Sequence, residues 1–277
     1  MEHSHITTDS KSLLIPKRAV PQWLQDIDRL LRGDATQVAV LKARGIDVAD
    51  GGVGIAILLL GLVYGACMGF FTLLRGDSSW LLQFISGMVK VPMLFVLTLL
   101  VTFPSLYVFN ALMGSRLSGM VLWRLLTSST AVTMAVLASF GPVVAFFSLS
   151  TTSYSFMLLL NVLMFGVSGF LGLKFLLQTL HRIAHTLSIR EVEVTPPVLN
   201  PDPANAGALE TVKGQTPVRQ TQVVFRIWII VFGLVGAQMS WVLRPFLGSP
   251  NEPFAILRSR ESNFFQAVWQ HLTNLFS

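Results

Sequence analysis

Residues 88–114 read MVKVPMLFVLTLLVTFPSLYVFNALMG, and this stretch decides the fold. After Lys90 it carries no charged side chain, and it contains the roughly 20 apolar residues that a helix needs to cross the hydrocarbon of a bilayer. Pro104 removes a backbone donor in the middle of the run. In lipid the carbonyl that it frees needs a partner, and the hydroxyls of Ser105 and Thr102 are candidates. A helix of this kind predicts a packed bundle of membrane-spanning helices.

Hydrophobic residues make up 52% of the 277-residue chain, and charged residues only 12%. Soluble domains are about one quarter charged, so this composition predicts a polytopic membrane protein. The net charge of +6 comes from basic residues that flank apolar segments, which favours membrane anchoring and no nucleic-acid partner. Cys67 is the single cysteine, so one chain can form neither a disulfide nor a cysteine metal cluster.

The apolar runs predict an all-α transmembrane helical bundle with about five spans. They cover residues 53–74, 91–113, 126–149, 156–177 and 223–243. The chain divides into a polar amino-terminal region at 1–50, a transmembrane domain at 51–243 and a carboxyl-terminal segment at 244–277. Residues 178–222 are rich in proline and small polar residues, so we expect a flexible cytoplasmic loop there, with a strand-like piece at 189–194.

Two of the expected spans carry glycines at spacings that create small helix faces. Gly61, Gly65 and Gly69 repeat every four residues in the first span, and Gly166, Gly169 and Gly172 recur in the fourth. Small residues let helix backbones approach closely, which holds helices together where lipid removes the hydrophobic drive. We expect both helices to pack closely, against partner helices that the sequence does not identify.

Amphipathic helices are expected at both ends of the chain. Trp23, Leu24, Ile27, Leu30 and Leu31 recur at helical spacing, and this helix either lies at the membrane surface or binds a partner. A second helix begins near Asn263, is too short to span, and has an apolar face that includes Phe264, Phe265 and Trp269.

The segment at 244–277 is expected to fold back onto the bundle or onto a partner, because its apolar helix face needs a cover. Lipid headgroups are the alternative cover. Arg244, Arg258 and Arg260 are interface candidates that could pair with carboxylates or with lipid phosphates.

Basic residues predict the orientation of the chain. Fifteen Lys and Arg residues precede the first span or lie in or beside the second and fourth loops, whereas five lie on the other side, namely Arg75, Lys90, Arg244, Arg258 and Arg260. Loops rich in Lys and Arg stay in the cytoplasm. We therefore expect a cytoplasmic amino terminus and an extracytoplasmic carboxyl terminus.

The residue types give no catalytic constellation and no cofactor or metal site. Every Asp and Glu lies outside the apolar runs, and we expect no ionisable group at membrane depth, where an enzyme or a proton-coupled carrier would be expected to place one. The polar residues of the spans include Asn110, Asn161, Gln238 and Ser240; we expect them to hydrogen-bond between helices, and lining a conduction path is the alternative. His181 and His185 have metal-ligand spacing but no evident third ligand.

A polar amino-terminal region followed by five closely packed spans resembles the Yip-domain family of membrane proteins. The local likeness lies in Gly87 to Gly114, where Lys90-Val91-Pro92 leads into an apolar helix with a second proline. The block from Trp241 to Pro250, with Phe254, Arg258 and Ser262-Asn263-Phe264, is similar to that of bacterial five-span proteins. Eukaryotic Yip-family members act in vesicle traffic with small GTPases. The resemblance implies a binding or membrane-organising role and supplies no catalytic residues.

These features favour a non-enzymatic membrane subunit or scaffold, in an oligomer or larger complex of the bacterial cytoplasmic membrane. Its expected partners are membrane lipids, further copies of the chain, or other membrane proteins. The alternative is a channel or carrier lined by the second and third spans. Pro104 and Pro142 are expected to kink these two spans, and interrupted helices build the sites of many transporters.

Overall fold

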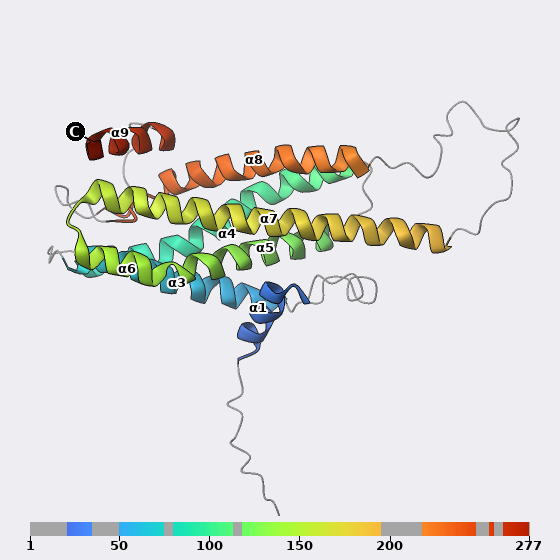
Figure 1. Ribbon diagram of the computed structural model, residues 1–277, viewed down its shortest axis with the longest axis horizontal. Coiled ribbons are helices and arrows are strands. Elements are labelled where there is room, and N and C mark those ends of the chain that lie inside the picture. Colours follow the sequence, from blue (N-terminus) through green and yellow to red (C-terminus); the bar gives the residue numbers. More distant parts are fainter. Residues whose placement is uncertain are drawn as a thin grey trace, which may run out of the picture.

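The structure is a computed structural model that describes residues 21–34, 50–74, 80–112, 118–194, 218–247, 255–257 and 263–276, without the side chains of 50, 109–112, 184–194, 218–226 and 276. Regular structure in these ranges is entirely helical (Figure 1). The helices are α1 (Gln22–Arg32), α3 (Asp50–Leu73), α4 (Trp80–Leu112), α5 (Gly119–Ser139), α6 (Gly141–Ser150), α7 (Tyr154–Val194), α8 (Val218–Val242) and α9 (Phe264–Phe276). The expected all-α class is confirmed for the described residues.

Four stretches are long and apolar enough to cross a membrane. They are Gly51–Leu73, Trp80–Val108, Gly119–Ser150 across α5 and α6, and Tyr154–Ile183. The fifth helix, α8, has 25 residues, of which the described apolar part Ile227–Val242 is shorter. Large apolar side chains point outward on all of them, and lipid is the solvent that accepts such a surface. The chain folds as a polytopic transmembrane bundle, which agrees with the expectation of about five spans.

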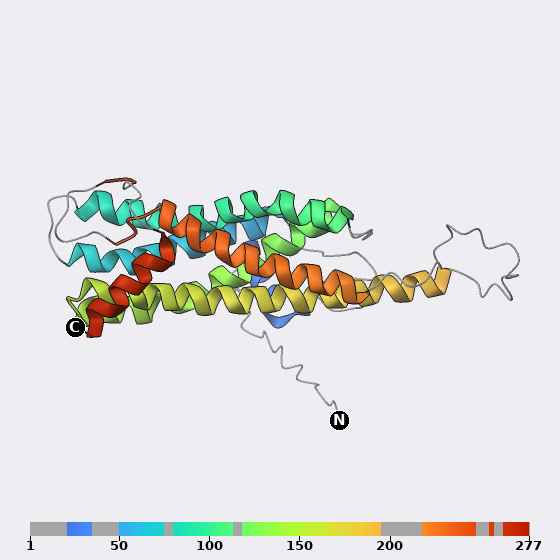
Figure 2. The same cartoon turned by 90° about the horizontal axis from the view of Figure 1, so that it is seen from above.

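The long helices run side by side and alternate in direction (Figures 1 and 2). We call the end of the bundle where α3 begins the α1 end, because α1 packs against α3 and α5 there. The opposite end, where α7 begins, is the α9 end, because α9 packs against α7 and α8. Figure 2 shows α9 running obliquely to the long helices. Amphipathic helices therefore lie at opposite ends of the bundle.

Helix α5 forms the centre of the bundle, between α3 and α7. Its buried apolar residues include Leu122, Leu125, Met134 and Leu137. It also buries hydroxyls, and those of Thr130 and Thr133 donate to the carbonyls of Leu126 and Ser129, one turn earlier in the same helix. Ser129 instead donates to the carbonyl of Gly172 across the interface with α7, at 2.8 Å. These three hydroxyls at the centre of the bundle thus find acceptors inside it.

Three expected boundaries were wrong. The third span begins at Gly119 and not at Leu126, so Arg124 lies within α5. The second span begins at Trp80 and not at Val91, so the residues expected as a loop up to Lys90 are helical. Helix α7 continues to Val194, so the expected loop and its strand-like piece are helical up to that residue. Leu176, Leu180 and Ile183 are buried at helical spacing on α7, and no glycine or proline follows Gly172 until Pro196, so nothing ends the helix earlier. Residues 195–217 lie outside the description.

Candidate functional site

The glycine stripe of α3 packs directly against α4. A Cβ atom on Gly61 would lie 2.8 Å from Pro92 Cβ, and one on Gly69 would lie 2.6 Å from the ring of Phe84. At Gly65 the contact is with backbone, because a Cβ there would lie 2.6 Å from the Cα of Met88. A side chain at Gly65 would therefore push the two helices apart, and the partner of the stripe belongs to the same chain.

The same contacts place Lys90 level with the middle of the spanning stretch of α3. Gly61 lies level with Pro92, and Gly65 lies level with Met88, so Lys90 lies between these two levels. The halfway point of the spanning stretch Gly51–Leu73 also falls between the two glycines. Lys90 is about 15 Å along α4 from Trp80 at 1.5 Å per residue. Its side chain is only 5% exposed, so an ionisable residue is buried within a stretch that is long and apolar enough to span.

Lys90 binds the chain that follows α8. Its ammonium donates to the carbonyl of Pro245 at 2.8 Å. Gln83 lies on the same face of α4 and donates through Nε2 to the carbonyls of Pro245 and Phe246, at 3.4 and 3.2 Å. Gly87 lies between them, where a Cβ would come within 3.3 Å of the Phe246 carbonyl oxygen. We call residues 243–247 the strap.

Helix α8 ends at about the depth of Lys90. It runs antiparallel to α4, because Trp228 donates to Ser105 at 3.1 Å and Gly236 contacts Thr98, whereas the strap reaches Lys90. Figure 1 shows α8 ending short of the end of the bundle where α9 lies. The fifth crossing is therefore part helix and part non-helical strap.

A helix that ends inside a membrane leaves carbonyl groups without intrahelical partners, and it presents the negative end of its dipole. Both favour a nearby cation. Non-helical backbone at this depth is tolerated only where protein or water satisfies it. Lys90 and Gln83 do so for two carbonyls of the strap, so this contact is what allows α8 to stop early.

The strap is also held by apolar contacts. Leu243 and Leu247 are buried, and the ring of Phe246 lies 6.5 Å from that of Phe165 on α7, centroid to centroid. Phe165 in turn packs edge-on against Tyr64 on α3, at 5.5 Å. The strap therefore joins α4 and α7 and closes one side of the core.

The expectation that no ionisable group lies at membrane depth was wrong, because Lys90 had been assigned to a loop. The signal in the sequence was the apolar run that already begins at Trp80, ten residues before the lysine. Lys174 also lies within α7, but its side chain is exposed and can reach toward the interface. Lys90 differs from it because protein surrounds it.

Only one of the three glycines expected as a packing face on α7 has that role within the chain. A Cβ on Gly172 would collide with Thr133 Oγ1, whereas Gly166 and Gly169 have nothing within 4 Å of theirs. Steps of three residues rotate around the helix, so these glycines do not share one narrow face. Gly166 is exposed, beside Phe170, which is 68% exposed.

The two prolines expected to kink the spans, Pro104 and Pro142, are both exposed. Helix α4 continues through Pro104, and neither candidate hydroxyl has a described bond to the carbonyl that this proline frees: Ser105 donates to Thr102, and Thr102 donates to Thr98. Pro142 lies in the first turn of α6, where the third span breaks after Phe140. A Cβ on the adjacent Gly141 would lie 3.0 Å from Cys67 Sγ, so α3 fills this break.

The polar residues expected to join helices have mixed roles. Asn161 accepts a hydrogen bond from Tyr64 at 2.8 Å, which links α7 to α3. Ser240 donates to Ala237 within its own helix, and Gln238 is exposed. The side chain of Asn110 lies outside the description. Trp228 is a buried link between α8 and α4 that sequence reasoning missed.

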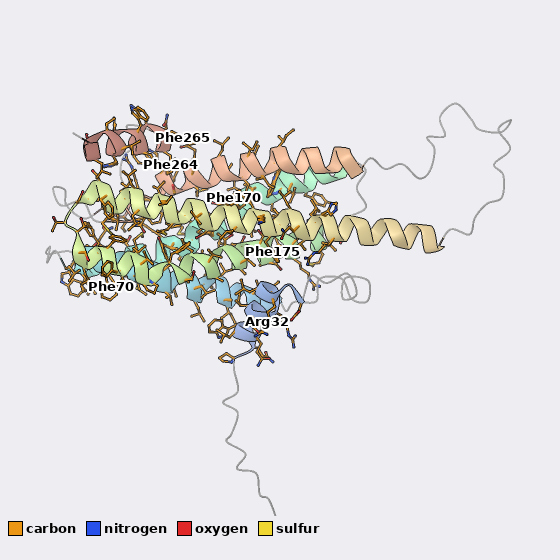
Figure 3. All side chains as sticks on the ribbon, in the orientation of Figure 1. Arg32, Phe70, Phe170, Phe175, Phe264 and Phe265 are labelled. Atoms are coloured by element: carbon orange, nitrogen blue, oxygen red, sulfur yellow. The ribbon has the colours of Figure 1, made fainter. Side chains whose placement is uncertain are left out.

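The helices at the two ends use their apolar faces differently. In α1, Ile27 and Leu30 are buried and Trp23 packs partly against the core, whereas Leu24 and Leu31 stay exposed. Asn263 caps α9 as expected, accepting a 2.9 Å bond from the Gln266 amide. Figure 3 shows Phe264 and Phe265 at the same end of the bundle as Phe70 of α3.

Within α9, Ala267 is buried, while Phe265 and Trp269 are exposed. One side of the helix thus covers the bundle, and the other apolar side chains are left for lipid or a partner. Of the three arginines proposed for this region, Arg244 has its guanidinium 3.9 Å from the ring centroid of Trp241, while Arg258 and Arg260 lie outside the described residues.

The helices and the strap define a multi-pass integral membrane protein. Over the described part of the chain, no group of three or more His, Cys, Asp or Glu side chains is placed to hold a metal ion. No family model matches the sequence, and no curated protein and no solved structure matches it.

Proposed function

We propose that this protein is a non-enzymatic subunit or scaffold of a bacterial cytoplasmic membrane, which acts through contacts with lipids and with other membrane helices. The observation that carries the proposal is the open side of α7. Only 28% of its spanning window is buried, against 39% to 44% in the other three. Gly166 lies exposed on this helix, and Gly169 has no neighbour that a side chain would meet. Such a surface allows the backbone of another helix to approach closely.

Leucine substitutions at these glycines test the proposal. Gly166→Leu and Gly169→Leu should fold normally, because no atom of the chain lies within 4 Å of either new Cβ. They should nevertheless lose any oligomer or co-purifying membrane protein that the unchanged chain retains in mild detergent. Gly54→Leu is the matched control, because Gly54 is equally open but lies on α3. Unchanged assembly in both α7 variants would reject this surface.

The proposed location and orientation rest on charge. With Lys90 placed inside the membrane, the basic residues on the α9 side are reduced to Arg75, Arg244, Arg258 and Arg260, so the contrast with the fifteen on the other side grows. This favours a cytoplasmic amino terminus and an extracytoplasmic carboxyl terminus. The resemblance of residues 87–114 to Yip-domain proteins favours the same membrane-organising class.

The second candidate function is a channel or carrier, and Lys90 is the observation that favours it. Ionisable residues buried at membrane depth are usually functional, and unwound helix ends near the midplane form the ion sites of many transporters. The support lies at the end of α8, where Lys90 is buried, and not at Pro104 or Pro142, which are both exposed. Ion-flux measurements in liposomes test it. A Lys90→Met variant should lose any flux that the unchanged protein shows, whereas Lys174→Met should keep it.

A further inference from the structure

His271 connects α9 to the first turn of α7. Its Nδ1 lies 3.1 Å from Ser155 Oγ, within hydrogen-bonding distance. Its ring packs against that of Tyr154, with the centroids 5.7 Å apart. His271 is the only ionisable residue in the sequence of α9, and histidine is the side chain that ordinarily titrates between pH 5 and 8.

The surroundings of His271 disfavour its charged form. Burial takes the ring partly out of water and lowers the pKa of His271 below its ordinary value. The first turn of α7 carries the positive end of the helix dipole, which acts in the same direction. The Tyr154 ring opposes this, because aromatic rings attract cations. The Ser155 hydroxyl favours neither form of the His271 ring, because it can donate to the uncharged ring or accept from the charged one.

The elements packed around His271 bring no carboxylate to stabilise an imidazolium. On α7 the next ionisable residue after Tyr154 is Lys174, about 30 Å further along at 1.5 Å per residue. The described side chains of α8, at 227–242, include no ionisable group. Arg244 is the charged residue of the strap, and its guanidinium lies over Trp241. These groups leave the charged ring without an opposite charge on α7 up to residue 183, on α8 from residue 227, or on the strap.

We propose that His271 makes the docking of α9 an acid-sensitive latch. When Nδ1 takes up a proton from the solvent, the charged ring is expelled from its partly buried position against α7, and α9 leaves the bundle. The strap stays in place, because Lys90 and Gln83 hold it independently of α9. Release uncovers the buried side of α9 at Ala267 together with the first turn of α7. On the proposed orientation this happens outside the cytoplasm, so the latch would respond to external pH.

The direction of the pH dependence follows from the two states of the latch. In the undocked helix the histidine has its ordinary pKa of about 6.5, and in the docked helix its pKa is lower. Docking is therefore at full strength above about pH 6.5. It weakens as the pH falls below that value, and it stops weakening only when the docked form also binds a proton.

Cysteine labelling of the full-length protein in liposomes tests the latch. In a Cys67→Ala background, Ala267→Cys reports undocking, because Ala267 is buried against the bundle. Asn274→Cys is the matched control, because it is exposed on the same helix, and its labelling rate corrects for the pH dependence of the reagent. The ratio of the two rates should rise severalfold between pH 8 and pH 5, and His271→Gln should remove this rise.

A ratio that stays constant with pH would overturn the latch, and so would a rise that persists with His271→Gln. Should Ala267→Cys disturb the packing, hydrogen exchange of residues 264–276 in the unsubstituted protein also measures whether α9 undocks at low pH. After correction for the intrinsic pH dependence of exchange, protection of this helix should fall between pH 8 and pH 5. Constant protection would reject the proposal.

Discussion

The ammonium group of Lys90 donates a 2.8 Å hydrogen bond to the carbonyl of Pro245, and this bond joins the second span to the chain that follows the fifth. It resolves two difficulties together. A lysine buried in lipid needs a polar partner, and a helix that stops at mid-depth leaves carbonyls that need donors. The ammonium supplies the donor that the strap carbonyl needs, and the carbonyl supplies the acceptor that the buried ammonium needs. Removing either group should therefore destabilise the protein, because the other then stays buried without this hydrogen bond.

Replacing Lys90 with methionine should therefore destabilise the protein. A hydrogen bond to a charged group contributes about 1.5 to 3 kcal/mol, so we expect Lys90→Met to lower the free energy of unfolding by about 2 kcal/mol. Thermal unfolding in detergent measures the change. Lys174→Met is the matched control, because its side chain is exposed, and it should have little effect. Equal melting temperatures for the two variants would show that the bond from Lys90 to the strap does not stabilise the protein.

The contact between α3 and α4 predicts unequal effects for two glycines of one helix. At Gly65 even a methyl group would lie 2.6 Å from the Cα of Met88, so Gly65→Ala should cost about 1 to 3 kcal/mol and Gly65→Leu more. Gly54 faces open space, so Gly54→Ala and Gly54→Leu should leave stability unchanged or slightly raised. Melting temperature and oligomeric state compare the pairs. Similar losses at the two positions would reject the close contact.

The orientation predicts which reagents reach the two ends of the chain. In a Cys67→Ala background, cysteines at Ser10 and Ser259 should label from opposite sides of the membrane of intact cells. The Ser259→Cys variant should react with a reagent that does not cross the membrane, and Ser10→Cys should react only after permeabilisation. Labelling of both from one side would refute an odd number of crossings.

Truncation after Gly248 separates the contribution of α9 from that of the strap. The shortened chain keeps the residues that Lys90 and Gln83 bind, but it loses the buried contacts of Ala267 and its neighbours on α9. We expect the free energy of unfolding to fall by about 2 kcal/mol, which is the order of one buried large apolar side chain. A melting temperature and an oligomeric state equal to those of the full chain would show that α9 is only a surface anchor.

Hydrophobic periodicity identified the helices themselves, because helix formation depends on local composition. The apolar runs gave the helical class and the approximate number of spans, and amphipathic spacing gave the helices at Gln22–Arg32 and Phe264–Phe276. Periodicity does not identify Lys90 as a residue of a span, because a charge within an apolar run is locally indistinguishable from the edge of a loop. It also does not predict the helix at 178–194, because the composition there is polar, although no residue there stops a helix.

The sequence by itself determined that this chain enters a membrane as helices, because a helix satisfies its backbone groups within its own segment, as lipid requires, and each apolar run is long enough to cross as one. Only the tertiary structure decided which helix the glycines of α3 meet, why Gly166 and Gly169 meet none, and where the fifth helix stops. These depend on contacts between residues far apart in the chain. The bond from Lys90 to Pro245 spans 155 positions, and it forms only when α8 has packed against α4.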